Sequence, residues 1–566
     1  MGKTLMIRGL VPILLLGLAV LATVRPSLAE DSADLILQQG VFYPVQPAGR
    51  VEGSLAVRGG RIVYLGPDAG AARFRGSKTQ VIDLAGRTVT PGLIDAHSHL
   101  AGLGQALEQV DLTAAPTYGE IVRRVREAAA KVPKGTWVRG RGWDQNLWPE
   151  KEFPTHDALS AAVPDHPVWL TRVDGHAALV NASAMEILQL DPEIQDPSGG
   201  RFLRHAGDTE GRLTGVMIDN AMDVVGGRMP APSVQDRERG LRTAARHCLE
   251  LGLTTVTDMG VGPVDVAAYT NLLKANELPI RSALFLGDDE QWLSAWFQQG
   301  PQVDPGSRLL IRGVKLYADG ALGSRGAALL EPYSDDANNL GLLVATGAHL
   351  EDVSRRAAQA GFQVGIHAIG DRGSLVAIDA MEKAIAGKPD ARFRLEHTQV
   401  TRVQDLQRMA KLGIIASMQP THATSDMPWA DERLGDGRLE RAYAWRKVLD
   451  FGGRLALGSD FPVESADPRL GLYAAVTRQD LAGQPAGGWL PGERLTREEA
   501  LRGFTLDAAW SLLLEKEVGS LEVGKRADLV VFARDVMTVP EAEIPKVEVD
   551  YTLVDGKVMF ERGKRP

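Results

Sequence analysis

The sequence has almost no cysteine. Its 566 residues include one, Cys248, so the chain can form neither an internal disulfide nor a cysteine-based metal cluster. It also lacks basic blocks, and 63 Lys and Arg face 72 Asp and Glu, which argues against nucleic acid as a main partner. Beyond the first thirty residues, no stretch is apolar enough to predict a membrane helix.

The first segment has the pattern of a secretory signal. Lys3 and Arg8 form a basic start, Leu10–Val24 is an apolar run, and Ser27–Ala29 offers small residues for a signal peptidase. The apolar run is short for a bilayer span. We therefore expect residues 1–29 to be removed and the mature protein to be periplasmic or secreted, without a membrane partner. A retained N-terminal anchor is the alternative.

The two ends of the mature chain differ from its middle in the secondary-structure pattern of their sequences. Residues 30–88 and 515–566 contain short strand patterns separated by turns, which predicts one small β-sandwich built from both termini. In residues 89–514, apolar runs that end in polar residues alternate with helical patterns, which predicts an α/β fold of the (β/α)₈ TIM-barrel type. The eight runs are Val89–His99, Leu253–Met259, Ile280–Leu286, Ile311–Tyr317, Gln363–Ile369, Phe393–Thr398, Ile414–Gln419 and Arg454–Asp460.

One connection of this barrel is far too long. Roughly 150 residues separate the first run from the second, whereas connections in compact domains are usually a few residues long. We therefore predict an inserted α/β subdomain after the first strand, at about residues 104–235. This stretch holds Trp137, Trp143, Trp148 and Trp169.

Five of the eight runs carry a metal-type ligand at or near their ends. Residues two apart on a strand point the same way, so His97 and His99 can bind one ion together. A single histidine is more often structural, but the carboxyl ends of barrel strands converge on one mouth, where active sites lie. The joint pattern predicts a metal site there. Its candidate ligands are His97, His99, Lys315, His367, His397 and Asp460.

These residues lie in motifs that resemble a known family. Val89–His99 resembles the first-strand motif of the amidohydrolase superfamily, Leu457–Asp460 its eighth-strand motif, and Gly519–Val530 its return into the small sandwich. More narrowly, the chain is similar to amidohydrolase family 3, the branch that contains N-substituted formamide deformylase. The narrower motifs are Gly142–Asp144, Asp174–His176, Lys315–Gly320, His367–Asp371 and Glu396-His397.

The resemblance implies a role for each ligand. His97 and His99 would bind the more buried ion beside Asp460, and His367 and His397 would bind a second ion. Lys315 would be carboxylated by CO₂ and bridge the two, because a carbamate is anionic whereas an ammonium repels a cation. An ordinary lysine paired with Asp319 is the alternative. The expected cofactor is a divalent metal, zinc by preference, with one or two ions.

The resemblance also implies a reaction. A metal ion lowers the pKa of bound water towards about 7 and polarises the substrate carbonyl. Asp460 would act as general base and pass the proton to the leaving amine. We expect hydrolysis of a carbon–nitrogen bond in a linear or N-substituted amide. The alternatives are a cyclic amide, carbamate or ester substrate, or a regulatory or binding homologue without turnover, which the complete ligand set disfavours.

Further residues are candidates for contact with a small-molecule substrate. His176, in the inserted region, can cap the mouth, and Arg325 can pair with a substrate carboxylate. Each candidate also has a structural alternative, such as a loop hydrogen bond or a surface ion pair. The full set is His176, Trp143, Asp319, Arg325, Gln419 and His422. The predicted surface is also large enough for a homodimer.

Overall fold

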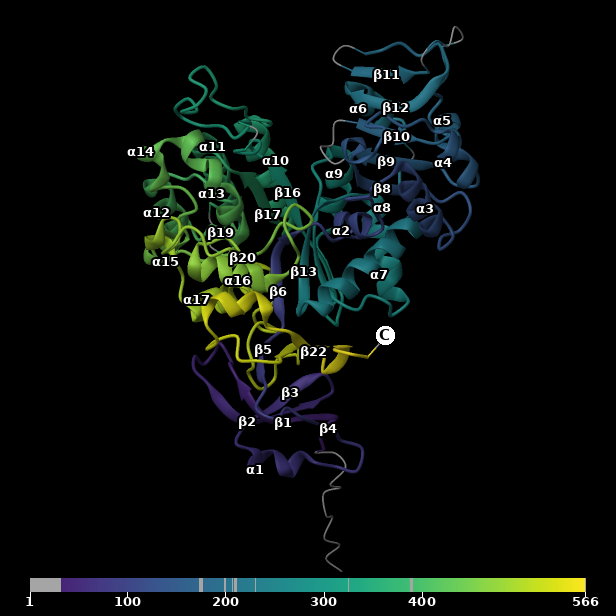
Figure 1. The fold of residues 1–566 in the computed structure, drawn as a ribbon. Coiled ribbons are helices and arrows are strands. Elements are labelled where there is room, and N and C mark those ends of the chain that lie inside the picture. Colours follow the sequence, from purple (N-terminus) through teal and green to yellow (C-terminus); the bar gives the residue numbers. More distant parts are fainter. Residues whose placement is uncertain are drawn as a thin grey trace, which may run out of the picture.

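The computed structural model describes residues 32–564, except 173–176, 198–199, 206, 208–210, 230, 324 and 387–389. The predicted signal, residues 1–29, lies outside the described residues. Figure 1 shows three parts: a small sheet at the base, a central barrel, and a subdomain beside the barrel mouth. Within the described part of the chain, no helix is long and apolar enough to cross a membrane.

Eight parallel strands form the central barrel, and each predicted run overlaps one of them, although β13 and β16 extend two residues beyond their runs. Hydrogen bonds join neighbours from β6 to β20 in chain order. At the seam, the backbone N–H of Asp460 donates to the His97 carbonyl at 2.8 Å, so the sheet is nearly closed. This confirms the predicted fold. The strands are β6 (Leu93–Ser98), β13 (Leu253–Val261), β14 (Arg281–Leu286), β16 (Leu309–Tyr317), β17 (Gln363–Ala368), β18 (Arg394–His397), β19 (Ile415–Met418) and β20 (Leu455–Leu457).

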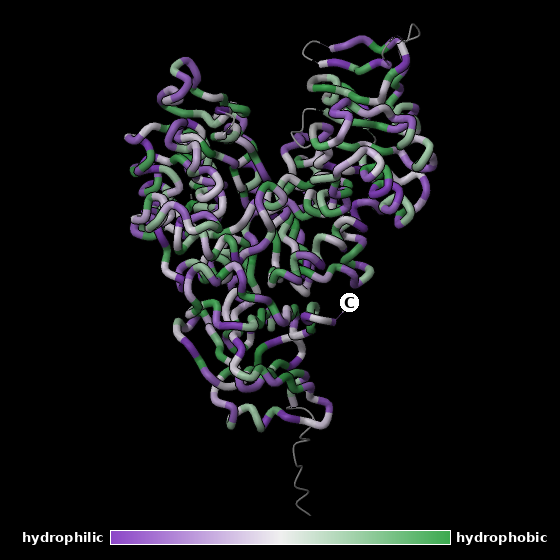
Figure 2. The backbone as a smooth tube through the Cα atoms, in the orientation of Figure 1, coloured by the Kyte–Doolittle hydropathy of each residue, from purple (hydrophilic) through white to green (hydrophobic). Residues whose placement is uncertain are grey.

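Amphipathic helices cover the barrel. In α7 (Val234–Glu250), the buried residues Leu241, Ala244, Ala245 and Cys248 recur at helical spacing and pack against the strands. Hydrophilic and hydrophobic residues alternate along the outer helices in Figure 2. The main covering helices are α7, α8 (Pro263–Lys274), α9 (Glu290–Gln299), α10 (Gly347–Ala360), α11 (Asp371–Ile385), α12 (Val403–Leu412), α13 (Pro420–Leu434), α15 (Trp445–Asp450), α16 (Pro468–Thr477), α17 (Arg497–Gly503) and α18 (Leu506–Ser511).

Strands from both ends of the chain form the small sheet, as the sequence predicts. Its order is β23-β22-β21-β5-β1-β2-β3, with β4 paired to β1. Leu37, Phe42 and Leu55 share one core with Leu529 and Leu553. The strands are β1 (Leu35–Phe42), β2 (Val51–Arg58), β3 (Arg61–Gly66), β4 (Gln80–Asp83), β5 (Thr88–Pro91), β21 (Leu529–Phe532), β22 (Val549–Val554) and β23 (Lys557–Glu561).

The first predicted run, Val89–His99, divides into two strands. β5 belongs to the small sheet and β6 to the barrel, with Gly92 between them. A Cβ on Gly92 would lie 2.1 Å from Thr254 Oγ1, so only glycine fits this crossing. One short segment therefore joins the small sheet rigidly to the barrel.

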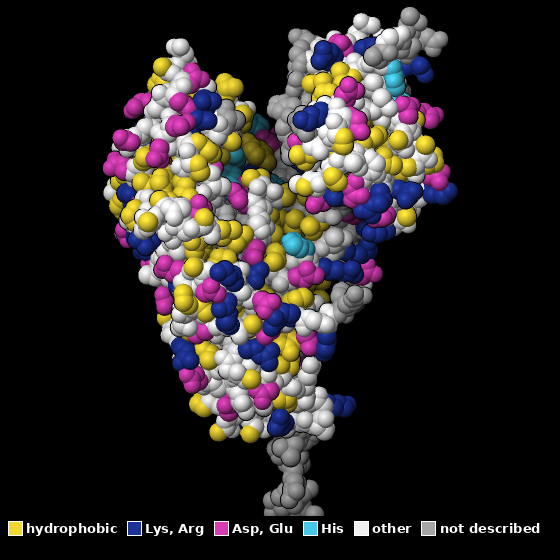
Figure 3. All heavy atoms as spheres, in the orientation of Figure 1, with side chains coloured by type: hydrophobic (Ala, Val, Ile, Leu, Met, Phe, Trp, Pro, Cys, Tyr) yellow, Lys and Arg dark blue, Asp and Glu magenta, His cyan; other side chains and the backbone are white. Residues whose placement is uncertain are grey.

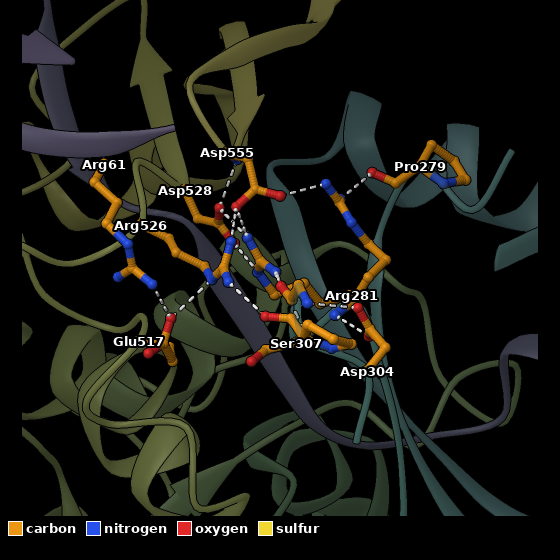
Figure 4. Close-up of polar contacts among 12 residues, drawn as sticks. Arg61, Pro279, Arg281, Asp304, Ser307, Glu517, Arg526, Asp528 and Asp555 are labelled. Atoms are coloured by element: carbon orange, nitrogen blue, oxygen red, sulfur yellow. Dashed lines mark hydrogen bonds and ion pairs between the residues drawn. The ribbon is translucent and has the colours of Figure 1, made fainter. Parts of the chain in front are cut away.

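A network of buried charges also joins these two parts (Figure 4). Arg281, at the start of β14, is fully buried and donates to Asp528 through Nε at 2.6 Å and Nη2 at 3.0 Å. Asp555 accepts from Arg281 and, at 2.6 Å and 2.9 Å, from Arg308 and Arg526. Since Asp528 and Asp555 come from the C-terminal segment, these pairs fix that segment to the base of the barrel.

The inserted subdomain lies between β6 and β13, as predicted. Its six-stranded sheet has its own core, and α2 (Leu100–Leu107) leads into it from the barrel. The strands are β7 (Val110–Asp111), β8 (Val138–Trp143), β9 (Val168–Arg172), β10 (Ala177–Val180), β11 (Gly200–Arg204) and β12 (Leu213–Asp219), with helices α3 (Tyr118–Ala129), α4 (Asp157–Ala162), α5 (Ala182–Ile187) and α6 (Asn220–Gly226).

Candidate metal centre

The six predicted ligands lie together at the carboxyl ends of the barrel strands. His97, Lys315, His367 and His397 are on β6, β16, β17 and β18, while His99 and Asp460 follow β6 and β20. Figure 3 shows a deep hollow between the inserted subdomain and the barrel helices, with histidine side chains on its inner surface. We refer to these six residues as the metal centre.

Three of the six form a compact buried group. One ligand atom from each of His97, His397 and Asp460 lies within 4.8 Å of the others. His97 Nε2 is 3.5 Å from Asp460 Oδ1, and His99 Nε2 is 3.1 Å from the same oxygen. Such separations between donor atoms suit a single bound ion.

Hydrogen bonds fix the orientation of three of the imidazoles. In each, Nδ1 faces an acceptor and Nε2 turns towards the centre, which is the arrangement that neighbouring acceptors impose on metal-binding histidines. The acceptors are Glu396 Oε2 for His97 at 2.6 Å, the Met259 carbonyl for His99 at 3.0 Å, and Gln419 Oε1 for His397 at 2.9 Å.

The contact between His99 and Asp460 is the strongest evidence for a cation. His99 donates Nδ1–H to a carbonyl, so a neutral ring presents a lone pair at Nε2 to Asp460 Oδ1. Two acceptors 3.1 Å apart need a proton or a metal ion between them. Without metal, burial lowers the pKa of His99, but the hydrogen bond to Asp460 together with the charges of Asp460 and Asp258 outweighs this, so the pKa is raised. A divalent ion meets the same need, so the residues present fit a metal.

Asp460 is an ionised carboxylate in a strained position. Burial raises its pKa, but the neighbouring His97, His99 and His397 hold it well below the usual value. Its φ of 63° is in the left-handed region, as is that of His397 at 72°. Oδ1 is buried, and apart from the imidazole nitrogens of His97 and His99 it has no polar partner among the described residues. A bound cation would satisfy that oxygen.

The other histidines are held in the neutral state that metal binding requires. Burial and the adjacent Lys315 lower the pKa of His97 to about 4 and that of His367 to about 3. Burial and the neighbouring imidazoles hold the pKa of His397 well below its usual value. The His367 and His397 rings are 4.6 Å apart, which places His367 at the edge of the compact group.

Lys315 lies inside this centre. Its Nζ is 3.4 Å from His97 Nε2, and burial lowers its pKa to about 8. Asp319, the alternative partner of Lys315, instead accepts hydrogen bonds from the backbone N–H groups of Ala328, Ile369 and Gly370 at 2.8–2.9 Å. A lowered pKa increases the share of neutral amine, the form that reacts with CO₂.

Two further residues of the site were not predicted individually. Glu396, which accepts a hydrogen bond from His97, is fully buried. It also accepts hydrogen bonds from Arg394 Nε at 2.8 Å and Arg394 Nη2 at 3.0 Å. Tyr317 is 41% exposed, and its ring lies 5.6 Å from that of His367. Alternation along the strand is the signal that could have found Tyr317, because it lies two positions from Lys315. Glu396 directly precedes His397, so alternation gives no such signal for it.

Gln419 and His422, predicted as substrate contacts, lie beside the centre. Gln419 bonds His397, and the His422 ring is 5.8 Å from that of His397. His422 Nδ1 accepts from the Gln399 amide at 3.2 Å, so its proton is on Nε2, 3.7 Å from Asp460 Oδ2. That Nε2 has no hydrogen-bond partner within the described part of the chain.

The other predicted contacts lie elsewhere. Asp319 is buried behind His367, 3.7 Å from its Nε2. Arg325 pairs with Asp335 at 2.9 Å on the loop after β16. Trp143 is buried in the core of the inserted subdomain, where its indole N–H donates to a backbone carbonyl. His176 lies outside the described residues.

A second group of possible ligands lies on the inserted subdomain. His156, Asp157 and His205 each offer an atom within 4.8 Å of the others, but the group is partly exposed. Sequence reasoning treats both histidines as structural. Measurements of metal content must therefore separate this group from the centre.

Comparisons with known proteins agree with this geometry. A family model described as Amidohydrolase family matches residues 80–560. The chain is 33% identical to the protein LONG AFTER FAR-RED 3 of Arabidopsis thaliana over 543 residues, which is 93% of this chain and 92% of the plant protein. It is 28% identical to N-substituted formamide deformylase of Arthrobacter pascens over 542 residues, 94% of this chain and 98% of that enzyme. An uncharacterised metal-dependent hydrolase from Pyrococcus furiosus has a similar structure, with a TM-score of 0.76, 31% identity, and coverage of 89% of this chain and 100% of that one.

Proposed function

Since the chain belongs to the amidohydrolase family, we propose that it hydrolyses the carbon–nitrogen bond of a linear or N-substituted amide with a bound divalent metal. The contact between His99 Nε2 and Asp460 Oδ1, two acceptor atoms 3.1 Å apart, carries the metal part of this proposal. The likeness to N-substituted formamide deformylase supports the substrate class.

We propose zinc as the metal, held by His97, His99, His367, His397 and Asp460, with a carboxylated Lys315 as an additional ligand. Three neutral imidazoles with fixed Nδ1 atoms and a carboxylate are a donor set that zinc accepts. A metal ion in this position supplies a Lewis acid and lowers the pKa of water. The remaining chemistry belongs to side chains of the protein.

Asp460 moves the proton in this mechanism. As an ionised carboxylate, it takes a proton from the attacking water. It then delivers that proton to the leaving nitrogen, so that water and amide become a carboxylic acid and an amine. His422, whose Nε2–H has no acceptor among the described residues, donates to the substrate carbonyl oxygen.

We also propose that residues 1–29 direct export, so that the enzyme acts in the periplasm or outside the cell. The basic start and apolar run of this segment support the proposal. Mass spectrometry of the protein recovered from the exported fraction tests it, since cleavage after Ala29 gives a mature chain that begins at Glu30.

The first test combines metal content with turnover. The mature protein is analysed for bound metals and assayed on N-substituted formamides, N-acyl amino acids and simple esters, before and after chelation. We expect bound divalent metal and formamide cleavage that chelation abolishes and zinc restores. A His205→Ala variant serves as control, because removal of the partly exposed group must leave activity unchanged.

The same panel separates the alternatives. Faster cleavage of esters than of amides would replace the amide assignment while keeping the hydrolase. Metal binding without cleavage of any compound would favour a binding or regulatory protein.

A further inference from the structure

A cavity of about 360 Å³ lies outside the metal centre, where the inserted subdomain meets the barrel. Helices α2 and α7 form one side of it, and the start of β8 with the end of α5 forms the other. Its volume is within the range of small-molecule sites. The walls are partly apolar, with Ala101, Trp137, Ile187 and Pro232.

The cavity contains one cation without a partner. Arg139 follows Trp137 at the start of β8, and both line the cavity. The guanidinium of Arg139 makes no hydrogen bond or ion pair with any residue that the structure describes. Burial and the nearby Arg237 hold its pKa below the usual value. Arg139 is half-buried, and guanidinium N–H donors without an acceptor among the described residues favour a carboxylate, which accepts charge-assisted hydrogen bonds.

The other charges around the cavity are already compensated. Arg237 pairs with Asp265 at 2.9 Å. Arg239 pairs with Glu108 at 2.9 Å and with Asp236 at 3.0 Å. Asp236 also accepts the N-cap hydrogen bonds of Ser233 in α7, so its carboxylate is committed to the helix start. The charges around the cavity therefore balance, and what Arg139 offers a ligand is a set of guanidinium N–H donors that no described residue occupies.

We propose that this cavity binds a small carboxylic acid with an apolar body. The carboxylate pairs with the guanidinium of Arg139, whose planar fork suits two parallel hydrogen bonds. The apolar body lies against Trp137 and Ile187. This site is separate from the metal centre and does not depend on the reaction proposed above.

Three probes of equal size and different charge test the proposal. Phenylacetate, 2-phenylethanol and 2-phenylethylamine are titrated into the full-length mature protein by calorimetry. We expect phenylacetate to bind, the alcohol to bind at least about tenfold more weakly because it lacks the charge-assisted pair, and the amine not to bind. Equal binding of acid and alcohol would overturn the proposal.

Variants then locate the site. Arg139→Gln is expected to weaken phenylacetate binding about tenfold or more, and Trp137→Ala to weaken acid and alcohol alike. Arg126→Gln, an exposed arginine on α3 in the same subdomain, is the matched control and must bind phenylacetate as the wild type does. Undiminished binding by Arg139→Gln would place the ligand elsewhere, for instance at the metal centre, and would refute the assignment. So would an absence of phenylacetate binding at millimolar concentration.

Discussion

At the metal centre, Asp460 combines two roles in one side chain. One carboxylate oxygen faces His97 and His99, and the proposed mechanism also requires the group to accept a proton. We expect Asp460→Asn to lower turnover by at least about a hundredfold, because an amide cannot take up the proton of water. Steady-state kinetics on the best substrate measures this.

The same substitution should leave the fold nearly intact, since Asn keeps the shape of the side chain. Thermal unfolding monitored by circular dichroism checks this point. Asp450→Asn, at a carboxylate that is 60% exposed, is the control and must retain full activity. Turnover by Asp460→Asn at the wild-type rate would show that another group is the base.

Lys315 gives a second prediction at this scale. If its carbamate is a ligand, Lys315→Ala loses metal and activity, by about ten- to a hundredfold, as the loss of a metal-site partner usually does. A short carboxylic acid such as acetate should partly restore both, because it replaces the missing anion. Lys411→Ala, an exposed lysine of α12, is the control. Unchanged metal content in Lys315→Ala would exclude the bridging role.

His367 predicts a pH effect on the metal-free protein. Its pKa is about 3 in the fold and about 6.5 when unfolded, so between these values the unfolded chain binds more protons. The stability that His367 contributes therefore falls as the pH drops from about 6.5 towards 3. We expect wild type to lose stability relative to His367→Gln over this range.

Urea unfolding in the presence of chelator, at pH 7 and at pH 5, measures this difference. A buried acid without a hydrogen bond or ion pair to His367, such as Asp95 with its pKa raised to about 7, affects both proteins equally and cancels. A stability difference that stays constant with pH would mean that the imidazole is not buried as neutral.

The sequence predicted the six candidate ligands, which lie together in the structure, but not Glu396, which orients His97. His97, His99 and Asp460 stand out because they recur in motifs at strand ends. Glu396 and Arg394 share a strand with Leu395 and His397, and nothing in their spacing shows that one carboxylate reaches across the barrel to His97. That contact depends on the closure of the barrel, which joins residues 299 positions apart.

At the scale of elements, helix α2 connects two sites. It begins directly after His99 and lines the Arg139 cavity with Ala101 and Gln105. Its contact with α7 is unusually close, because a Cβ on Gly104 would lie 2.5 Å from the backbone of Gly240. The position of α2 is therefore fixed by a pair of glycines.

We expect Gly104→Ala to destabilise the protein by about 1–3 kcal/mol, because one of the two helices must shift. Chemical denaturation measures this, and metal affinity should fall as well since His99 precedes the helix. Gly226→Ala, in α6, is the matched control. A Cβ there meets nothing within 4 Å, so this change should stabilise by about 0.5–1 kcal/mol. Equal effects of the two substitutions would argue against close packing of α2 on α7.

Sequence patterns located the barrel strands well and the inserted strands poorly. Each barrel strand lies largely within an apolar run of the sequence, so the eight runs are visible without a structure. In the insertion, β7 has only two residues and β11 begins in Gly200-Arg201. Neither segment shows the alternation of apolar and polar residues that predicts a strand. The division of Val89–His99 into β5 and β6 was also hidden, because the turn at Gly92 depends on Thr254 from another strand.

At the scale of the whole molecule, Arg281 holds the small sheet to the barrel. Removal of this side chain leaves Asp528 and part of the charge of Asp555 buried without a partner. We expect Arg281→Met to destabilise the protein by about 3–5 kcal/mol, the usual cost of breaking a buried ion pair. Denaturant unfolding followed by both fluorescence and circular dichroism measures it.

Arg123→Met is the control for this substitution. Arg123 pairs with Glu120 and Glu127 on the exposed face of α3, where such pairs contribute little to stability. A comparable loss of stability in both variants would show that burial of the Arg281 pair is not what matters.

The pairing of β5 with β21 has a consequence for the order in which this protein is made. Strand β21 is among the last segments to be synthesised, yet it is the neighbour that covers β5, the strand leading directly into the barrel. Until it arrives, a growing chain exposes an open sheet edge, which is prone to pair with other chains. A ribosome that stops before β21 would therefore release an aggregating fragment rather than a smaller working enzyme.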